Sequence, residues 1–277
     1  MTTSLTHDTP QLAETYDRLS DSQFESGKRL VDRIGVEAGD RVLDVGCGTG
    51  RLARWMAERV GPQGSVVGID PLPERIAIAR ARAQAHVPAG APAISFEVGQ
   101  AEDLSAFAAE SFAAVCLSAV FHWVADKPKA LREIRRVLRP DGRMGVTTLP
   151  RELLASSTVT AVCAGVLTRA PYVERVDLSV LVASRGPTVT DILAMVVESG
   201  LQLVQLHVVE RTRTHPRGED VVDFLESSSF GNFLRMVPEE LRAPLRVDLA
   251  AAFDATRGPE GIVMRDYGTV FVARRGA

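Results

Sequence analysis

The stretch Val42-Leu43-Asp44-Val45-Gly46-Cys47-Gly48-Thr49-Gly50 decides the fold of this 277-residue chain. Its first four residues read as a short buried strand, and Leu52–Val60 reads as a helix that ends at Gly61-Pro62. A glycine turn between a strand and a helix lets the backbone come close to a ligand, and it aims backbone N–H groups at an anionic part of that ligand. Such turns also use glycine for packing alone, so the rest of the pattern has to decide between the two interpretations.

Strands and helices alternate along the chain after this turn. Helices between short buried strands are typical of βαβ units and of a parallel sheet that is covered on both faces. The expected strands are 42–45, 65–69, 94–98, 112–118, 143–148, 201–209 and 269–273, and the expected helices include 52–60, 73–86, 129–138 and 188–199. The sequence therefore predicts an α/β fold with a doubly wound, mostly parallel seven-stranded sheet and helices on both faces.

Three segments lie outside this alternation. Residues 1–38 read as an N-terminal helical cover, and residues 151–187 and 211–262 read as mostly helical insertions that carry aromatic side chains. We expect the insertions to form a helical lid over one end of the sheet, so that residues 1–277 make up a single domain.

Composition argues against several classes of protein. The chain has 32 Lys+Arg against 35 Asp+Glu, which gives no electrostatic reason to expect a nucleic-acid partner. No apolar run approaches the roughly 18 residues that span a bilayer, and no signal-peptide pattern is visible, so we expect no membrane partner and a cytoplasmic location. Neither the three cysteines nor the five histidines have the spacing of a metal site, and we expect no metal.

Two acidic residues distinguish between the classes of cofactor that bind at a glycine turn between a strand and a helix. Asp70 ends the second expected strand, 20 residues after Gly50, where a carboxylate can accept hydrogen bonds from both ribose hydroxyls of a nucleoside. Dinucleotide-binding turns have the spacing G-x-G-x-x-G, and a pyrophosphate lies on them. Here the spacing is G-x-G-x-G, and Asp44 stands two residues before the first glycine. Its charge would repel a pyrophosphate but would suit a ligand with an ammonium and a sulfonium.

This pattern resembles motif I of the class I S-adenosylmethionine (SAM)-dependent methyltransferases. The resemblance runs from about Tyr16 to Thr148, with several motifs in order. It implies SAM as the cofactor and S-adenosylhomocysteine as the product. The cofactor-binding residues that it implies are Tyr16, Asp44, Gly46, Cys47, Gly48, Asp70, Pro71, Leu72, Gln100, Ala101, Glu102, Ser118 and Trp123.

The resemblance also implies what each part of the site contacts. The glycine turn borders the methionine part of SAM, with Asp44 near its amino group, and Pro71-Leu72 flanks the adenine. Tyr16 is similar to an N-terminal aromatic residue that closes over SAM, although packing of the first helix is an alternative. Cys47 needs to be small to fit in the turn, and no adjacent base would make it a nucleophile.

The stretch Gly99-Gln100-Ala101-Glu102-Asp103-Leu104 resembles the family's G-D-A-x-x-L segment, in which the acid and the alanine N–H read the adenine edge. Gln100 departs from this pattern, because it occupies the position of the acid. Its carbonyl oxygen can still accept a hydrogen bond from the adenine amino group, but without charge. Glu102 or Asp103 is the alternative source of this contact.

A third resemblance follows the fourth expected strand, where Ser118 leads into Phe121-His122-Trp123-Val124. This segment is similar to that of methyltransferases acting on small carboxylates. His122 lies beside the expected position of methyl transfer, where it acts as a general base or orients the loop. Trp123 is expected to form a wall of the pocket. The acids Glu174 and Glu226 of the insertions are alternative bases.

The sequence thus predicts a SAM-dependent methyltransferase that acts on a small-molecule acceptor, in natural-product biosynthesis. Helical insertions with aromatic side chains favour an enclosed pocket over an open platform for nucleic acid. A non-catalytic SAM-binding protein of the same fold is one alternative, and an NAD(P)-dependent oxidoreductase is another. Arg211, Arg213 and Arg217 alternate along an expected strand edge, where they form a solvated face or contact an anionic substrate.

Overall fold

The computed structural model describes residues 8–85, 92–176, 187–229, 233–234 and 237–276. The chain divides into two compact units. The first, which we call the sheet unit, consists of Ser22–Thr148, Pro187–Val208 and Thr269–Ala277. The second, which we call the helical unit, consists of Met1–Asp21, Leu149–Gly186 and Val209–Gly268.

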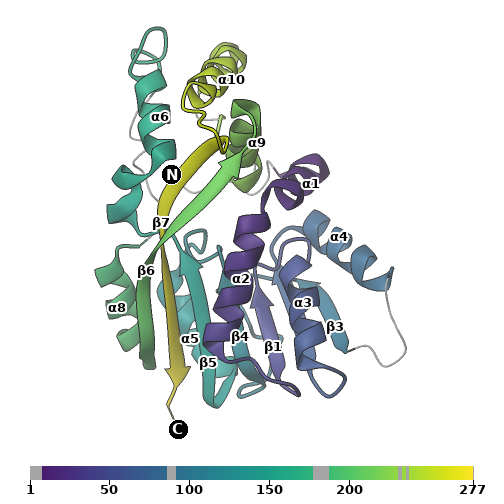
Figure 1. Ribbon diagram of the computed structural model, residues 1–277. Helices are drawn as coiled ribbons and strands as arrows, with labels where there is room; N and C mark the ends of the chain where they lie inside the picture. Colours follow the sequence, from purple (N-terminus) through teal and green to yellow (C-terminus); the bar gives the residue numbers. More distant parts are fainter. Residues whose placement is uncertain (1–7, 86–91, 177–186, 230–232, 235–236, 277) are drawn as a thin grey trace. The chain divides into compact units, whose positions relative to one another are not determined.

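A seven-stranded sheet has the strand order β3-β2-β1-β4-β5-β7-β6 (Figure 1). The strands from β3 to β5 are parallel to their neighbours, and β7 is antiparallel to β5. This arrangement confirms the predicted α/β fold with a mostly parallel sheet of seven strands. The strands are β1 (Arg41–Val45), β2 (Ser65–Asp70), β3 (Ala93–Val98), β4 (Phe112–Ser118), β5 (Leu138–Thr148), β6 (Leu201–His215) and β7 (Ile262–Arg275).

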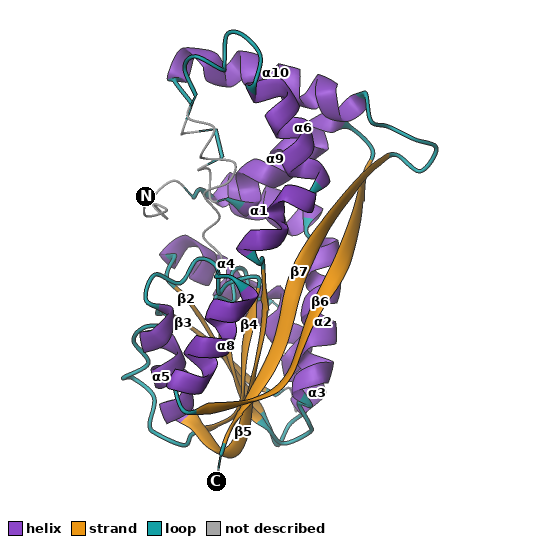
Figure 2. Cartoon of the chain, turned by 90° about the vertical axis from the view of Figure 1, so that its left-hand side faces the viewer, coloured by secondary structure: helices purple, strands orange, loops and turns teal. Residues whose placement is uncertain are grey.

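Helices cover both faces of the sheet, with α5 and α8 on one side and α2 and α3 on the other (Figure 2). The helices are α1 (Pro10–Leu19), α2 (Asp21–Ile34), α3 (Arg51–Val60), α4 (Pro73–Gln84), α5 (Lys127–Val137), the 3₁₀ helix η2 (Arg151–Ser156), α6 (Thr158–Leu167), α8 (Val189–Glu198), α9 (Gly218–Ser228) and α10 (Glu239–Asp254). Among the described residues, none of these helices has both the length and the apolar character needed to cross a bilayer.

The start of α5 differs from the sequence prediction for a local reason. The helix was expected from residue 129, and it begins at Lys127. The side chain of Asp126 accepts a hydrogen bond from the backbone N–H of Lys129 at 2.9 Å, and Pro128 stands in the first turn. Both features are typical of a helix N-terminus, because the cap satisfies an otherwise unpaired N–H and proline has none to lose.

The last two strands are much longer than expected. The predicted ranges 201–209 and 269–273 are wrong at one end each, since β6 continues to His215 and β7 begins at Ile262. The missed half of β6 alternates arginine and threonine, and that polar pattern looked like part of an insertion. In the structure, Arg211 and Arg213 of this half both pair with Asp266 of β7, so the charges are compensated within the paired strands.

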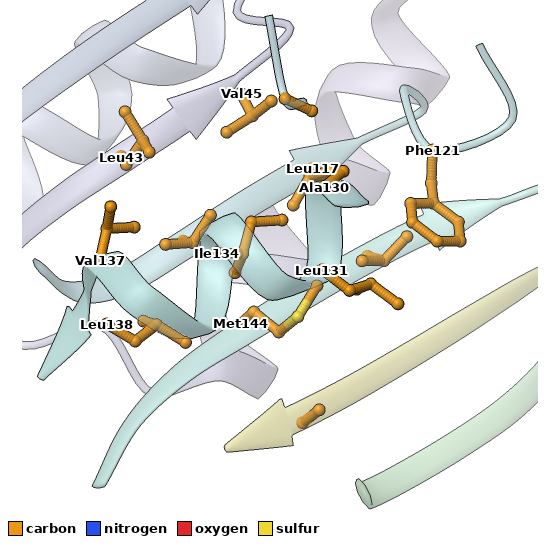
Figure 3. Close-up of a cluster of buried hydrophobic side chains, with 14 of the residues drawn as sticks. Leu43, Val45, Leu117, Phe121, Ala130, Leu131, Ile134, Val137, Leu138 and Met144 are labelled. Atoms are coloured by element: carbon orange, nitrogen blue, oxygen red, sulfur yellow. The ribbon is translucent and has the colours of Figure 1, made fainter. Parts of the chain in front are cut away.

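The core of the sheet unit lies where α5 packs on the sheet (Figure 3). Leu131 and Ile134 of α5 are fully buried, as are Leu43 of β1 and Met144 of β5. Burying one such side chain contributes roughly 1.5–3 kcal/mol to folding. The packing fixes the positions of β1 and β4, and the loops that follow these two strands carry most of the predicted site.

On the opposite face, a glycine permits α2 to approach the sheet closely. A Cβ atom built on Gly145 of β5 would lie 2.4 Å from Cγ1 of Ile34 and 2.9 Å from Cδ1 of Leu30. Both α2 side chains are fully buried. A side chain at position 145 would therefore force α2 away from the sheet.

We predict that Gly145→Ala lowers the free energy of unfolding by about 1–3 kcal/mol, because it overpacks this contact. Urea denaturation measures the change. Gly165→Ala is the matched control: a Cβ atom there meets nothing within 4 Å, so in α6 it should stabilise the helix slightly. In the variant Ile34→Ala, the same Gly145→Ala substitution should lower the free energy of unfolding by less. An equal decrease with and without Ile34→Ala would contradict the proposed contact.

Candidate functional site

Most of the predicted site residues lie at or after the carboxyl ends of β1, β2 and β4, which are side by side in the order β2-β1-β4, whereas Gln100, Ala101 and Glu102 follow β3. From β1 the chain proceeds outward through β2 and β3, and it then returns to the other side of β1 as β4. In open α/β sheets, ligands bind outside the carboxyl ends of the strands where the order reverses in this way. The topology therefore places the candidate site at the loops after β1 and β4.

The glycine turn after β1 requires its glycines. Gly46, Gly48 and Gly50 have φ values of +71°, +55° and +78°, a region that disfavours other residues. A Cβ atom on Gly46 would also lie 2.3 Å from the side chain of Val120, in the loop after β4. Gly50 precedes α3 without a side-chain cap, so the first N–H groups of this helix face the turn as backbone donors.

Asp70 ties this turn to the end of β2. One of its oxygens, Oδ2, accepts a hydrogen bond from the Gly48 N–H at 2.9 Å, and Oδ1 accepts one from the Leu72 N–H at 3.0 Å. An ionised carboxylate offers about four acceptor positions, so these two bonds are compatible with further bonds to ligand hydroxyls. Leu72 is buried and Pro71 is exposed. Asp70 thus orders the turn, whatever ligand it binds.

Asp44 is a buried carboxylate without compensation. Its side chain is 2% exposed, and Oδ2 has no hydrogen-bond partner among the described residues. Burial, with a smaller contribution from the negative charge of Asp70, raises the pKa of Asp44 to about 8. A cation beside Oδ2 would favour the charged form and supply the missing partner. The residues present therefore fit a ligand with an ammonium group.

Cys47 fills the interior of the turn. Its thiol is 3.7 Å from the Gly48 carbonyl oxygen, and burial raises the pKa of this thiol well above its usual value. A Cβ atom on Gly68 of β2 would lie 2.9 Å from its Sγ atom. Cys47 is therefore a small packing residue and is not activated as a nucleophile.

The segment after β3 assigns different tasks to its polar residues. Glu102 accepts hydrogen bonds from the backbone N–H groups of Ala125 and Asp126, at 2.8 and 3.2 Å, and so holds the loop before α5. Asp103 accepts hydrogen bonds from the N–H and hydroxyl of Ser105. The side chain of Gln100 is exposed and makes no hydrogen bond to another described residue. Of these three polar side chains, that of Gln100 has hydrogen-bonding capacity that the described residues do not use. The neighbouring residue, Ala101, is buried.

The loop after β4 holds His122 and Trp123 beside the end of β5. The Ala119 N–H donates to the Thr147 hydroxyl oxygen at 2.8 Å, in a tight turn where Ala119 has a φ of +60°. The rings of His122 and Trp123 are half-buried, with their centroids 5.0 Å apart. Nδ1 of His122 lies 3.4 Å from Oγ1 of Thr148, which fixes the orientation of the imidazole.

Sequence reasoning missed Thr147, Thr148 and Arg75. The two threonines end β5 and hold the loop after β4, but single threonines at the end of a strand belong to no motif. Arg75 is 5% exposed, and its Nη1 is 3.8 Å from a Cβ atom built on Gly48. Nothing in the sequence around Arg75 distinguishes it from the other arginines of α4.

Tyr16 and the alternating arginines belong to the helical unit. Tyr16 stacks on Phe224 with ring centroids 6.4 Å apart, which agrees with the alternative of a packing role. The predicted solvated face is wrong for two of the arginines: the side chains of Arg211 and Arg213 are only 21% and 13% exposed, because both pair with Asp266. Arg217, in contrast, is 60% exposed.

The two acids considered as alternative bases have different environments. Glu226 forms an ion pair with Arg246, and burial raises its pKa above the usual value. Glu174 is exposed.

The comparison with known families agrees with this geometry. Residues 43–146, which run from the middle of β1 to the end of β5, match a family model described as a methyltransferase domain. These residues, which include the glycine turn and the loop after β4, are thus similar to a methyltransferase domain.

Two curated relatives are similar to about half of the chain. A 2-phytyl-1,4-naphthoquinone methyltransferase of Thermosynechococcus vestitus is 37% identical over 142 residues, which cover 49% of this chain and 60% of the relative. Nocamycin O-methyltransferase of Saccharothrix syringae is 38% identical over 138 residues, which cover 50% of this chain and 48% of the relative. The chain thus spans about half to 60% of the length of these relatives.

A solved structure extends the likeness of fold beyond that half. The phosphoethanolamine N-methyltransferase 2 of Haemonchus contortus, in complex with phosphomonomethylethanolamine and S-adenosylhomocysteine, has a TM-score of 0.54. The match covers 91% of this chain and 53% of that one, at 17% identity. At this identity the likeness concerns the fold alone.

We predict that Asp44 makes the ligand-free sheet unit less stable as pH rises. The pKa of Asp44 is about 8 in the folded state, against a usual value of 3.8. Between these two pH values the folded state therefore keeps a proton on Asp44 that the unfolded state has lost. This contribution to stability is complete below about pH 4 and is lost as pH rises through 8. The melting temperature of Asp44→Asn, relative to that of the natural sequence, should therefore increase between pH 5 and pH 9.

Asp141→Asn, at an exposed position of β5, is the matched substitution and should show no such trend. Differential scanning fluorimetry at several pH values measures both variants. A constant difference between Asp44→Asn and the natural sequence would mean that Asp44 is already ionised when folded.

Proposed function

We propose that this protein is a SAM-dependent methyltransferase that transfers a methyl group to a small-molecule acceptor and releases S-adenosylhomocysteine. The observation that carries the proposal is the buried, unpartnered Oδ2 of Asp44 beside a glycine turn, within a methyltransferase domain. SAM has an ammonium and a sulfonium to place near this carboxylate. A nicotinamide dinucleotide would bring a pyrophosphate instead.

The residues of the sheet unit supply distinct contacts for such a cofactor. Asp44 pairs with the ammonium group, and Asp70 accepts hydrogen bonds from the ribose hydroxyls while it holds the glycine turn. Gln100 and the Ala101 N–H read the adenine edge. Leu72 and Pro71 pack against the adenine ring. Ser118 and Trp123 border the methyl group that is transferred.

When bound, SAM supplies an electrophilic methyl group on its sulfonium sulfur. The protein then has to hold the acceptor in line with that methyl group, and positioning of this kind can supply several kcal/mol. Because positive charge disappears as the methyl group leaves, the site needs no group that stabilises an anion. His122, oriented by Thr148, removes a proton from an acceptor that has to lose one.

The acceptor is proposed to be a small organic molecule of natural-product metabolism. Support comes from the two relatives, whose names mention small organic molecules, a phytyl-naphthoquinone and nocamycin. We further propose that residues 151–187 and 211–262 form a lid that determines acceptor choice, that Tyr16 closes over SAM, and that the enzyme works in the cytoplasm.

Calorimetry tests the choice of cofactor. We expect SAM and S-adenosylhomocysteine to bind and NAD to give no heat. Asp70→Ala should weaken SAM binding tenfold or more, about 1.4 kcal/mol, because it removes hydrogen bonds to the ribose and to the turn. Asp103→Ala removes a carboxylate that accepts hydrogen bonds from the N–H and hydroxyl of Ser105, and it should leave the affinity within threefold. Binding of NAD without SAM would refute the proposal.

Turnover of labelled SAM with a panel of phenols, carboxylic acids and quinols tests the reaction and the role of His122. With a hydroxyl acceptor, His122→Ala should lower kcat about 10²- to 10⁴-fold at pH 7 and leave SAM affinity unchanged. With a preformed carboxylate the loss should be under tenfold. SAM binding without turnover on any acceptor would favour the alternative of a non-catalytic SAM-binding protein.

A further inference from the structure

Strand β6 forms one edge of the sheet and pairs, among the described residues, only with β7 on its inner side. It exposes two apolar side chains: Val204 is 53% exposed and Val208 is 48% exposed. The helix that leads into it, α8, adds Leu193 at 40% and Val197 at 69%, which are one turn apart. All four residues lie in the segment Pro187–Val208 of the sheet unit.

The opposite edge strand, β3, has the features by which proteins protect an open edge. It is six residues long, it carries the exposed charge of Glu97, and the Arg80 Nε atom donates to the Phe96 carbonyl oxygen at 2.8 Å. Short strands and charged side chains of this kind discourage pairing with another chain. In β6, no side chain of the described residues donates to or accepts from the backbone of 201–208, and this part of the strand carries no acidic or lysine side chain.

The sequence of β6 is complementary to itself. In an antiparallel pair with a second copy, centred on Leu206, Val204 of one copy lies opposite Val208 of the other. Gln205 then lies opposite His207, and these two side chains already hydrogen-bond to each other within one chain, at 3.1 Å. Apolar residues thus meet apolar residues, and no like charges meet, which is the arrangement that stabilises cross-strand pairs.

We propose that this chain forms a two-fold symmetric homodimer in which residues 204–208 of β6 pair in antiparallel register with the same residues of a second copy. The register is centred on Leu206, and the two sheets join into one continuous sheet. A two-fold axis that passes between the two copies of β6 pairs both open strand edges with each other, because an isologous contact uses the same surface on each copy. Leu193 and Val197 extend the apolar surface beyond the strand itself.

Sedimentation velocity of the full chain tests the dimer. We expect a dimer at micromolar concentration, and we expect Val204→Lys or Val208→Lys to raise its dissociation constant tenfold or more. Val98→Lys is the matched control, since Val98 of the other edge strand is 54% exposed, and it should leave the dimer intact. A monomeric natural sequence, a larger oligomer, or equal effects of the three variants would overturn the proposal.

Disulfide trapping tests the register. A mixture of the single variants Val204→Cys and Val208→Cys should cross-link, because facing residues of antiparallel strands have Cα atoms about 4.5–5.5 Å apart, within the range for a disulfide. Either variant alone should not cross-link. The natural cysteines, Cys47, Cys116 and Cys163, are all buried, so they give little background. Cross-linking of one variant with itself, or none in the mixture, would contradict this register.

Discussion

The carboxylate of Asp70 joins the two segments on which the site depends. Its oxygens accept hydrogen bonds from Gly48, in the turn after β1, and from Leu72, at the start of the segment that leads into α4. The Gly46 and Cys47 N–H groups also donate to a single β2 carbonyl oxygen, that of Ile69, at 2.7 and 2.9 Å. The turn is therefore held along its length by the end of β2, and its shape does not depend on a ligand.

The two acids at this end of the sheet have opposite environments. Asp70 accepts hydrogen bonds from two backbone N–H groups, whereas Asp44 is buried and leaves Oδ2 unpartnered among the described residues. Because like charges disfavour each other, the ionised Asp70 adds to the cost of ionising Asp44. The same chemical group thus performs two tasks: one carboxylate builds the turn, and the other remains available for a cation.

The parts of the fold that the sequence predicted are those encoded locally. Residues 42–50 combine an apolar run with glycines that alone adopt positive φ at low cost, so strand, turn and helix could all be recognised. The outer halves of β6 and β7 could not, because their charges are compensated by Asp266, more than fifty residues from its arginine partners. The hydrogen bonds of Glu102 to the backbone of Ala125 and Asp126 could not be predicted either, since these partners follow a whole strand later.

The contact between Gly46 and Val120 restricts how this domain can diversify. The Val120 side chain occupies the space that a Cβ atom on Gly46 would need, so the loop that carries His122 and Trp123 is interlocked with the glycine turn. A substitution that moves this loop to admit a new acceptor would also disturb the cofactor side. Directed evolution toward new acceptors should therefore succeed most readily when residues 118–124 stay fixed and variation is confined to segments outside residues 43–146.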